Sequence, residues 1–436
     1  MLKVEQTWQN LRSSLWFLPS LIVMMAVGLA FVLIEVDTAI DHEVLSRWPR
    51  VFGSGADGAR GLLTTIASSM VTVVGVVFSI TVVALSLASS QYTSRVLRNF
   101  MRDRVNQWVL GLMIGVFAYC LVVLRTIRGG DEGAFVPSVS TLAGLVLGFV
   151  GIAALIYFIH HISTSIQAAH ILAAAAADTL RTVDRLYPVI AREEQELAEP
   201  ALDAGLWQSI NSDANGYLQS LDTAGLLRFA TERKTIVRLE RQVGDFVIQG
   251  TPLWSVHGLR VMDKPVKEPL RAFYTIGRQR TIEQDTAFGI RQIVDVALKA
   301  LSPGINDTTT AVMCVDYLTA ILFRLGQREI LSVHRDHDGE ARLLLQGPTY
   351  SSLLDGAIHQ IRRNAAGNAT MLEALLTAFG ILNARTAIPA RRAALRQHAE
   401  AVTRTARRSI SDAEDLEQLE AHANRLLDSW PRATNE

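Results

Sequence analysis

The stretch ALKALSPGINDTTTAV, residues 297–312, carries the residue types that most resemble a binding site. Pro303 lacks an amide hydrogen and disfavours helix in the residue before it, and Gly304 can adopt the left-handed conformation that ends a helix. Asp307 is then placed to act as the N-cap of the next apolar segment, with Asn306 bonding across the turn. The pattern predicts a corner between two helices.

The exposed amides of a helix start attract anions, so this corner could bind an anionic or phosphate-bearing small ligand. Arg278 and Arg280 precede the first of the two helices and could assist. The corner itself comprises Ser302, Pro303, Gly304, Asn306, Asp307, Thr308, Thr309 and Thr310. Two alternatives stay open: a capped turn without a ligand, which Asp307 favours because its carboxylate repels anions, and a subunit contact.

A second candidate is a stripe of small and hydroxyl-bearing residues in the uncharged stretch between Arg60 and Arg95. The stripe comprises Ser68, Thr72, Gly75, Ser79, Ser86, Ser90 and Thr93. At about 100° per residue these positions share one face of a helix. Such a face suits close packing between helices, or a wall that faces water or ions where several copies of the helix surround an axis.

Metal and catalytic sites are not favoured elsewhere. His160 and His161 do not share a helix face with His170, and no acidic residue follows them before Asp178. The stretch HRDHDGE, residues 334–340, is typical of a turn. We find no nucleophile and base at a recognisable spacing, no phosphate-binding loop and no strong metal motif. We therefore expect neither an enzyme nor a bound cofactor or metal.

The first part of the chain is predicted to lie in a lipid bilayer. The 436 residues are 49% hydrophobic, which is high for a soluble protein. Charged side chains are absent from four stretches of roughly the length that a bilayer core demands, about 20 residues: 15–34, 62–88, 108–124 and 139–159. The first has no cleavage pattern after it, so we expect a retained helix and not a signal peptide.

The orientation of these spans follows from the basic residues in the short loops. The loop between the second and third spans concentrates Arg95, Arg98, Arg102 and Arg104, which predicts that it is cytoplasmic. Both termini would then lie in the cytoplasm. The charge is balanced, with 42 basic and 42 acidic residues, and argues against a nucleic-acid partner. Two cysteines, one of them in a span, do not form a disulfide framework.

We expect three domains: a transmembrane domain over 1–175, a stalk helix with a small β module over 176–265, and a mainly helical domain over 266–436. The fold class is an α-helical membrane protein with four transmembrane helices and a mixed cytoplasmic region. Strands are predicted within 215–222 and 235–256, where apolar and polar residues alternate around glycines.

The β module resembles the half-motif of barrel-sandwich hybrid domains. The lysine signature of the biotinyl and lipoyl carriers is absent, since Lys234 lacks that context, so a structural module is favoured over a cofactor carrier. Beyond it, TIEQ predicts a capping box with Thr281 as the N-cap and Gln284 reaching back. Residues 333–347 predict a β-hairpin or loop, and three or four amphipathic helices follow.

The four spans, the loop TSRVLRNFMRDRVNQWVLG, the span end IHHISTSIQ and above all ALSPGINDTTTA resemble the bacterial predicted membrane proteins called domain of unknown function 2254. The resemblance covers nearly the whole chain. It implies a multi-pass protein of the bacterial cytoplasmic membrane, and it brings no established activity and no catalytic residues.

Two functional hypotheses follow. In the first, the protein is a homo-oligomer, channel-like or related to transport, in which the second span lines the axis. In the second, the membrane part is an anchor, and the cytoplasmic corner at Pro303 to Thr310 makes the protein a ligand sensor or a scaffold. The sequence identifies neither a transported species nor a subunit number.

Overall fold

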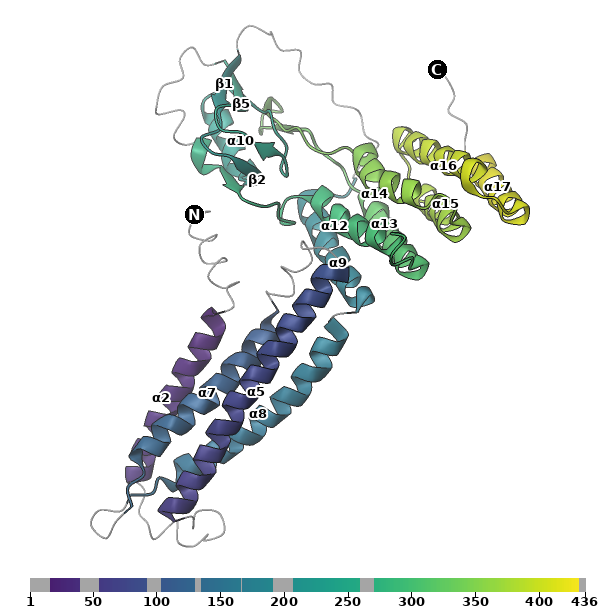
Figure 1. The fold of residues 1–436 in the computed structure, drawn as a ribbon. Helices are drawn as coiled ribbons and strands as arrows, with labels where there is room; N and C mark the ends of the chain where they lie inside the picture. The colour runs from purple at the N-terminus through teal and green to yellow at the C-terminus, as the bar shows by residue number, and fades with distance from the viewer. Residues whose placement is uncertain are drawn as a thin grey trace. The chain divides into compact units, whose positions relative to one another are not determined.

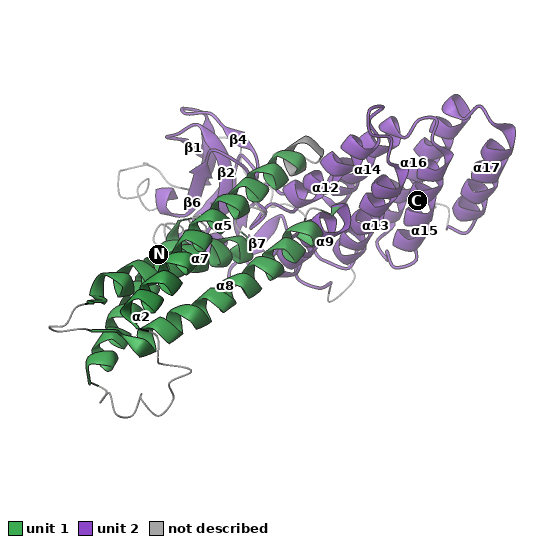
Figure 2. Cartoon of the chain, turned by 60° about the horizontal axis from the view of Figure 1, so that its bottom comes forward, with its two compact units in different colours: residues 1–167 green, residues 168–436 purple. Residues whose placement is uncertain are grey.

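The computed structural model describes most of the chain. The described residues are 16–39, 55–91, 103–129, 135–165, 167–190, 207–258 and 270–430. Contacts divide the chain into two compact units, residues 1–167 and 168–436 (Figure 2). The second unit begins with α9, Ala168–Leu186, which packs on two helices of that unit, α12 and α13.

The first unit is a bundle of four long apolar helices (Figure 1). They are α2 (Phe17–Ala39), α5 (Ala56–Gln91), α7 (Arg104–Thr126) and α8 (Ser138–Ser165). Each of the four predicted spans is helical over its described residues, except for a turn at Trp16 before the first helix. A fifth helix, α13 (Thr308–Leu325) in the second unit, is also long and apolar enough to cross a membrane. Length and composition alone therefore do not fix the number of membrane-spanning helices at four.

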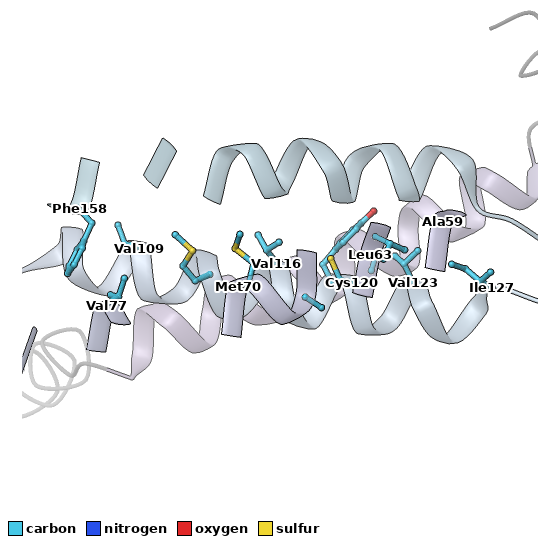
Figure 3. Packing of buried hydrophobic residues seen from close by; sticks show 14 of the residues in the cluster. Ala59, Leu63, Met70, Val77, Val109, Val116, Cys120, Val123, Ile127 and Phe158 are labelled. Atoms are coloured by element: carbon cyan, nitrogen blue, oxygen red, sulfur yellow. The ribbon is translucent and has the colours of Figure 1, made fainter. Parts of the chain in front are cut away.

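Helix α7 contacts each of the other three helices of the bundle. The buried side chains between α5 and α7 include Leu63, Met70 and Val77 on one helix and Val116 and Cys120 on the other (Figure 3). They form one continuous apolar core along the bundle. Because this core uses only one side of α5, the opposite side of that helix has no partner among the described residues.

Glycines set the close approaches in the bundle. A Cβ atom on Gly111 would lie 2.8 Å from the Cα of Pro19 in α2, and one on Gly144 would lie 2.7 Å from a methyl carbon of Leu63 in α5. Gly151 similarly faces Met70 of α5. The spaced glycines of α7 and α8 thus pack against α2 and α5 respectively, as close contacts between membrane helices require.

The second unit contains two small sheets with a common core. The strands are β1 (Trp207–Asn211), β2 (Gly216–Leu221), β3 (Ile236–Leu239), β4 (Phe246–Val247), β5 (Pro252–His257), β6 (Tyr274–Gly277), β7 (Val333–Arg335) and β8 (Ala341–Leu344). One sheet has the order β1-β5-β3-β8-β7 and the other β4-β2-β6. Leu218 of the smaller sheet and Trp254 of the larger are both fully buried in the same cluster, with α10 (Thr223–Glu232) covering them.

The predicted strands and the predicted hairpin are confirmed. The hairpin is β7–β8, and its second strand pairs in parallel with β3, with Val237 opposite Leu343. That pairing joins segments about 100 residues apart in the chain. The sequence does not indicate it, because each strand alone has only a short apolar pattern.

The remaining helices of the second unit are α12 (Thr286–Ala300), α13, α14 (Tyr350–Asn364), α15 (Ala369–Asn383), α16 (Pro389–Ser409) and α17 (Ala413–Asp428). The predicted capping box at Thr281 is wrong. Asp285 is the N-cap of α12, and its carboxylate accepts a hydrogen bond of 2.9 Å from the amide of Phe288. Gln284 bonds both the amide and the carbonyl of Leu221 instead, which ties this loop to β2.

Candidate functional site

The small and hydroxyl-bearing stripe lies on the surface of the bundle. The described residues of the stripe are all exposed: Ser68, Thr72, Gly75, Ser79 and Ser86. A Cβ atom placed on Gly75 would meet nothing within 4 Å. Ser90 belongs to α5, but its side chain lies outside the described residues, and so does Thr93. Packing among the described residues is therefore not the reason for the described part of the stripe.

The stripe and the packed face of α5 are on opposite sides of the helix. The packed face comprises Ala59, Leu63, Ala67, Met70, Val77 and Ala84, all buried. At about 100° per residue this set lies about 180° around the helix from Ser68, Ser79 and Ser86. Large exposed side chains, among them Phe78 and Val83, flank the stripe on its two sides. The result is a shallow polar strip between apolar margins.

The predicted corner between two helices is confirmed, but a different residue adopts the left-handed backbone conformation. The amide of Asp307 donates to the carbonyl of Ala300 at 2.8 Å, and the amide of Asn306 donates to Ser302 at 2.9 Å. The residue in the left-handed region is Asn306, with φ of 51°, and not Gly304. Asn tolerates this region because its short polar side chain bonds locally.

The polar groups of the corner bond one another. The carboxylate of Asp307 accepts from the amide of Thr310 at 3.0 Å and from its hydroxyl at 2.5 Å. These hydrogen bonds hold the pKa of Asp307 below its usual value, so the carboxylate is ionised at neutral pH. The hydroxyl of Thr308 accepts from the side-chain amide of Asn368, the N-cap of α15. The described corner is a capped joint with a fixed negative charge.

The two arginines are not at the corner. Both precede α12, whereas the corner follows it, and the 15 residues of this helix separate them by about 20 Å. Arg278 is exposed. Arg280 forms a two-pronged ion pair with Asp285, with Nε at 2.8 Å and Nη2 at 2.9 Å from the carboxylate oxygens. The predicted combination of arginine and corner is therefore not assembled in the structure.

One histidine has an acidic partner that the sequence did not indicate. His161, near the end of α8, contacts the carboxylate of Asp103, which is the N-cap of α7. Tyr157 stacks on the same imidazole. His170 belongs to α9 in the other unit. No group of three or more histidine, cysteine or acidic residues that could hold a metal occurs among the residues that the structure describes.

Comparison with known proteins identifies the family. Two relatives, uncharacterized proteins of Mycobacterium tuberculosis and Mycobacterium bovis, are each 35% identical over 417 residues, which cover 93% of this chain and 78% of the relative. No solved structure matches the chain. The family model described as "Predicted membrane protein" matches residues 12–380. The chain therefore belongs to the family of predicted membrane proteins called domain of unknown function 2254.

Proposed function

We propose that the protein is a homo-oligomer in the cytoplasmic membrane of a bacterium, and that α5 helices from several copies line a common axis in a channel-like or transport-related assembly. The observation that carries this proposal is the exposed stripe on α5, directly opposite the face that packs in the bundle. The apolar core of the bundle is complete without the stripe.

Contact with lipid alone does not require small or hydroxyl-bearing residues on a helix surface. Small residues on a helix surface allow another helix to approach closely, and hydroxyl groups can bond across the interface or to water. The hydroxyl of Thr72 donates to the backbone carbonyl of Ser68 at 3.0 Å. This donor therefore does not need water as a partner, and the stripe can also lie where water is scarce. A wall of hydroxyls without charged rings would discriminate weakly among ions.

The proposed topology has four spans, α2, α5, α7 and α8, and both termini in the cytoplasm. The arginine-rich loop before α7 supports this orientation. We place α13 outside the membrane because it packs on α9, α12, α14 and α15, and because it begins at the capped corner. The proposal assigns no enzymatic activity, cofactor or nucleic-acid partner to the chain.

Oligomeric state is the first test. The full-length protein in lipid nanodiscs should contain several copies by native mass spectrometry, and electron microscopy should show α5 nearest the symmetry axis. A monomer under these conditions would rule the proposal out.

Cysteine accessibility is the second test. The native cysteines, Cys120 and Cys314, are buried, so single cysteines can be introduced with little background. Ser68→Cys and Ser79→Cys should react with a water-soluble thiosulfonate, whereas Phe78→Cys, exposed on the flank of the stripe, should not. Equal protection of all three positions would mean that the stripe faces lipid or a dry helix contact, and not water.

The alternative function, a ligand sensor or scaffold acting at the Pro303 to Thr310 corner, has less support. The hydroxyl and carboxylate of Thr310 and Asp307 are bonded to each other, and the arginines lie at the far end of α12. An anion at this corner would be repelled by the carboxylate of Asp307, and neither Arg278 nor Arg280 would lie close enough to offset that charge.

A further inference from the structure

The second unit contains a cavity of about 360 Å³ where the β module meets the start of α12 and the end of α9. Its size falls within the range of small-molecule sites, about 300–1,000 Å³. The walls come from the turn after β3, the loop and first residues of α12, the segment before β7 and the segment after β8. Leu331, Gln346 and Gly347 are exposed, so the cavity opens to solvent there.

One wall contains the two-pronged ion pair between Arg280 and Asp285. The side chain of Asp285 is only 3% exposed, and it holds Arg280 and the first turn of α12 together. Gly244 fits against this pair with φ of 99°, and a Cβ atom there would lie 2.9 Å from Nη2 of Arg280. The guanidinium also lies 5.2 Å from the ring centre of Phe288. The cavity is therefore bounded by groups with little freedom to rearrange.

Thr286 is the polar group that these contacts leave unsatisfied. This first residue of α12 lines the cavity and is 1% exposed, yet its hydroxyl has no hydrogen-bond partner among the described residues. The Thr286 hydroxyl lies near that of Tyr187 and partly offsets the rise that burial causes in the pKa of Tyr187, but the two hydroxyls do not meet hydrogen-bond geometry. A buried hydroxyl without a partner costs about 1–3 kcal/mol, so a group that bonds it from the cavity would be favoured.

The charges around the cavity determine what kind of ligand fits. Two carboxylates, Asp245 and Asp285, face a single guanidinium, that of Arg280. Burial lowers the pKa of His334, so its imidazole is neutral at pH 7. An anion would meet an excess of negative charge. A cation would find both carboxylates already bonded, Asp285 to Arg280 and Asp245 to Gln242. Leu239, Ile330 and Leu345 add an apolar surface.

We propose that this cavity binds an uncharged small molecule with an apolar or aromatic body and one group that hydrogen-bonds the Thr286 hydroxyl. The site is distinct from the α5 stripe and from the corner at Pro303 to Thr310, and it does not depend on self-association. A ligand here would contact the β module, α9 and α12 at once, and it would stabilise the second unit by mass action.

Three probes of nearly the same shape test this assignment: benzamide, benzoate and benzamidinium, which are neutral, anionic and cationic at pH 7. Binding to the full-length protein in nanodiscs is measured by ligand-observed NMR and by the shift in the unfolding temperature. Benzamide should bind at millimolar concentration and more tightly than either charged analogue. Tighter binding of benzoate or of benzamidinium, or no binding of benzamide, would overturn the proposal.

Two variants locate the binding. Thr286→Val keeps the shape of the side chain and removes only the hydroxyl, so it should weaken benzamide about tenfold, the equivalent of one hydrogen bond, while the protein stays folded. Ala287→Phe should abolish binding by filling the cavity, since Ala287 lines it and is half-buried. Unchanged benzamide affinity in both variants would place the probe elsewhere and refute the site.

Discussion

Asp37, near the C-terminal end of α2, caps the N-terminus of α8 through Ser140. One carboxylate oxygen accepts from the amide of Val139 at 2.8 Å, and the other accepts from the amide and hydroxyl of Ser140 at 2.8 and 2.6 Å. Both residues are buried, at 4% and 0% exposure. A negative charge at a helix N-terminus is favourable, so this contact holds the end of α2 against the start of α8.

Removal of this cap should destabilise the bundle. Asp37→Ala leaves the half-buried amide of Val139 and the buried amide of Ser140 unpaired, and we expect a loss of about 1–3 kcal/mol of unfolding free energy. Titration with a denaturing detergent in mixed micelles measures the change. Asp57→Asn is the control, because its side chain at the start of α5 is fully exposed and should shift the midpoint little. Equal effects of the two substitutions would contradict the role assigned to Asp37.

The close contact of α7 with α2 should not accept a methyl group. Gly111→Ala places a Cβ atom 2.8 Å from the backbone of Pro19, and overpacking of this kind costs about 1–3 kcal/mol. Gly28→Ala in α2 meets no atom within 4 Å and serves as the matched control. The same micelle titration should separate them. A stable Gly111→Ala variant would mean that α2 and α7 can move apart at little cost.

The contact between α9 and α12 gives a parallel test in the second unit. A Cβ atom on Gly289 would lie 2.8 Å from Cγ2 and 3.0 Å from Cβ of Thr179, a fully buried residue of α9. Gly289→Ala should therefore lower the unfolding temperature. Gly356→Ala, in the exposed face of α14 with nothing within 4 Å, should raise stability slightly, by about 0.5–1 kcal/mol. Changes of the same sign in both variants would refute this packing.

The corner should have a pH-dependent stability. The folded-state pKa of Asp307 is lowered by its hydrogen bonds, so its contribution is present above the unfolded value near 3.8 and is lost as the pH falls through the folded value. Asp307→Ala should cost about 1 kcal/mol at neutral pH and less in acid. Thr309→Ala, an exposed change beside it, is the control. Thermal unfolding from pH 3 to pH 7 compares the two variants. If the destabilisation by Asp307→Ala is the same at every pH, loss of the ionised cap is not its cause.

Features that depend only on neighbouring residues were predicted correctly from the sequence. Hydropathy located the four apolar helices, and the chemistry of Pro303 and Asp307 gave the corner, because each depends on neighbours within a few residues. The expected capping box at Thr281 was wrong for a long-range reason. Thr281 and Asp285 are both suitable N-caps, but Gln284 is bonded to β2 and Asp285 to Arg280. The cavity was missed because its walls come from segments far apart in the sequence.

The parallel pairing of β3 with β8 has a consequence for biosynthesis. When β3 leaves the ribosome, the strand that completes its sheet is still about 100 residues away, beyond α12 and α13. Until then one edge of β3 offers unpaired amides and carbonyls to any passing strand. A polypeptide stopped at residue 265 would keep this edge permanently open. Nascent chains should therefore become resistant to protease and to aggregation only after residue 344 has emerged.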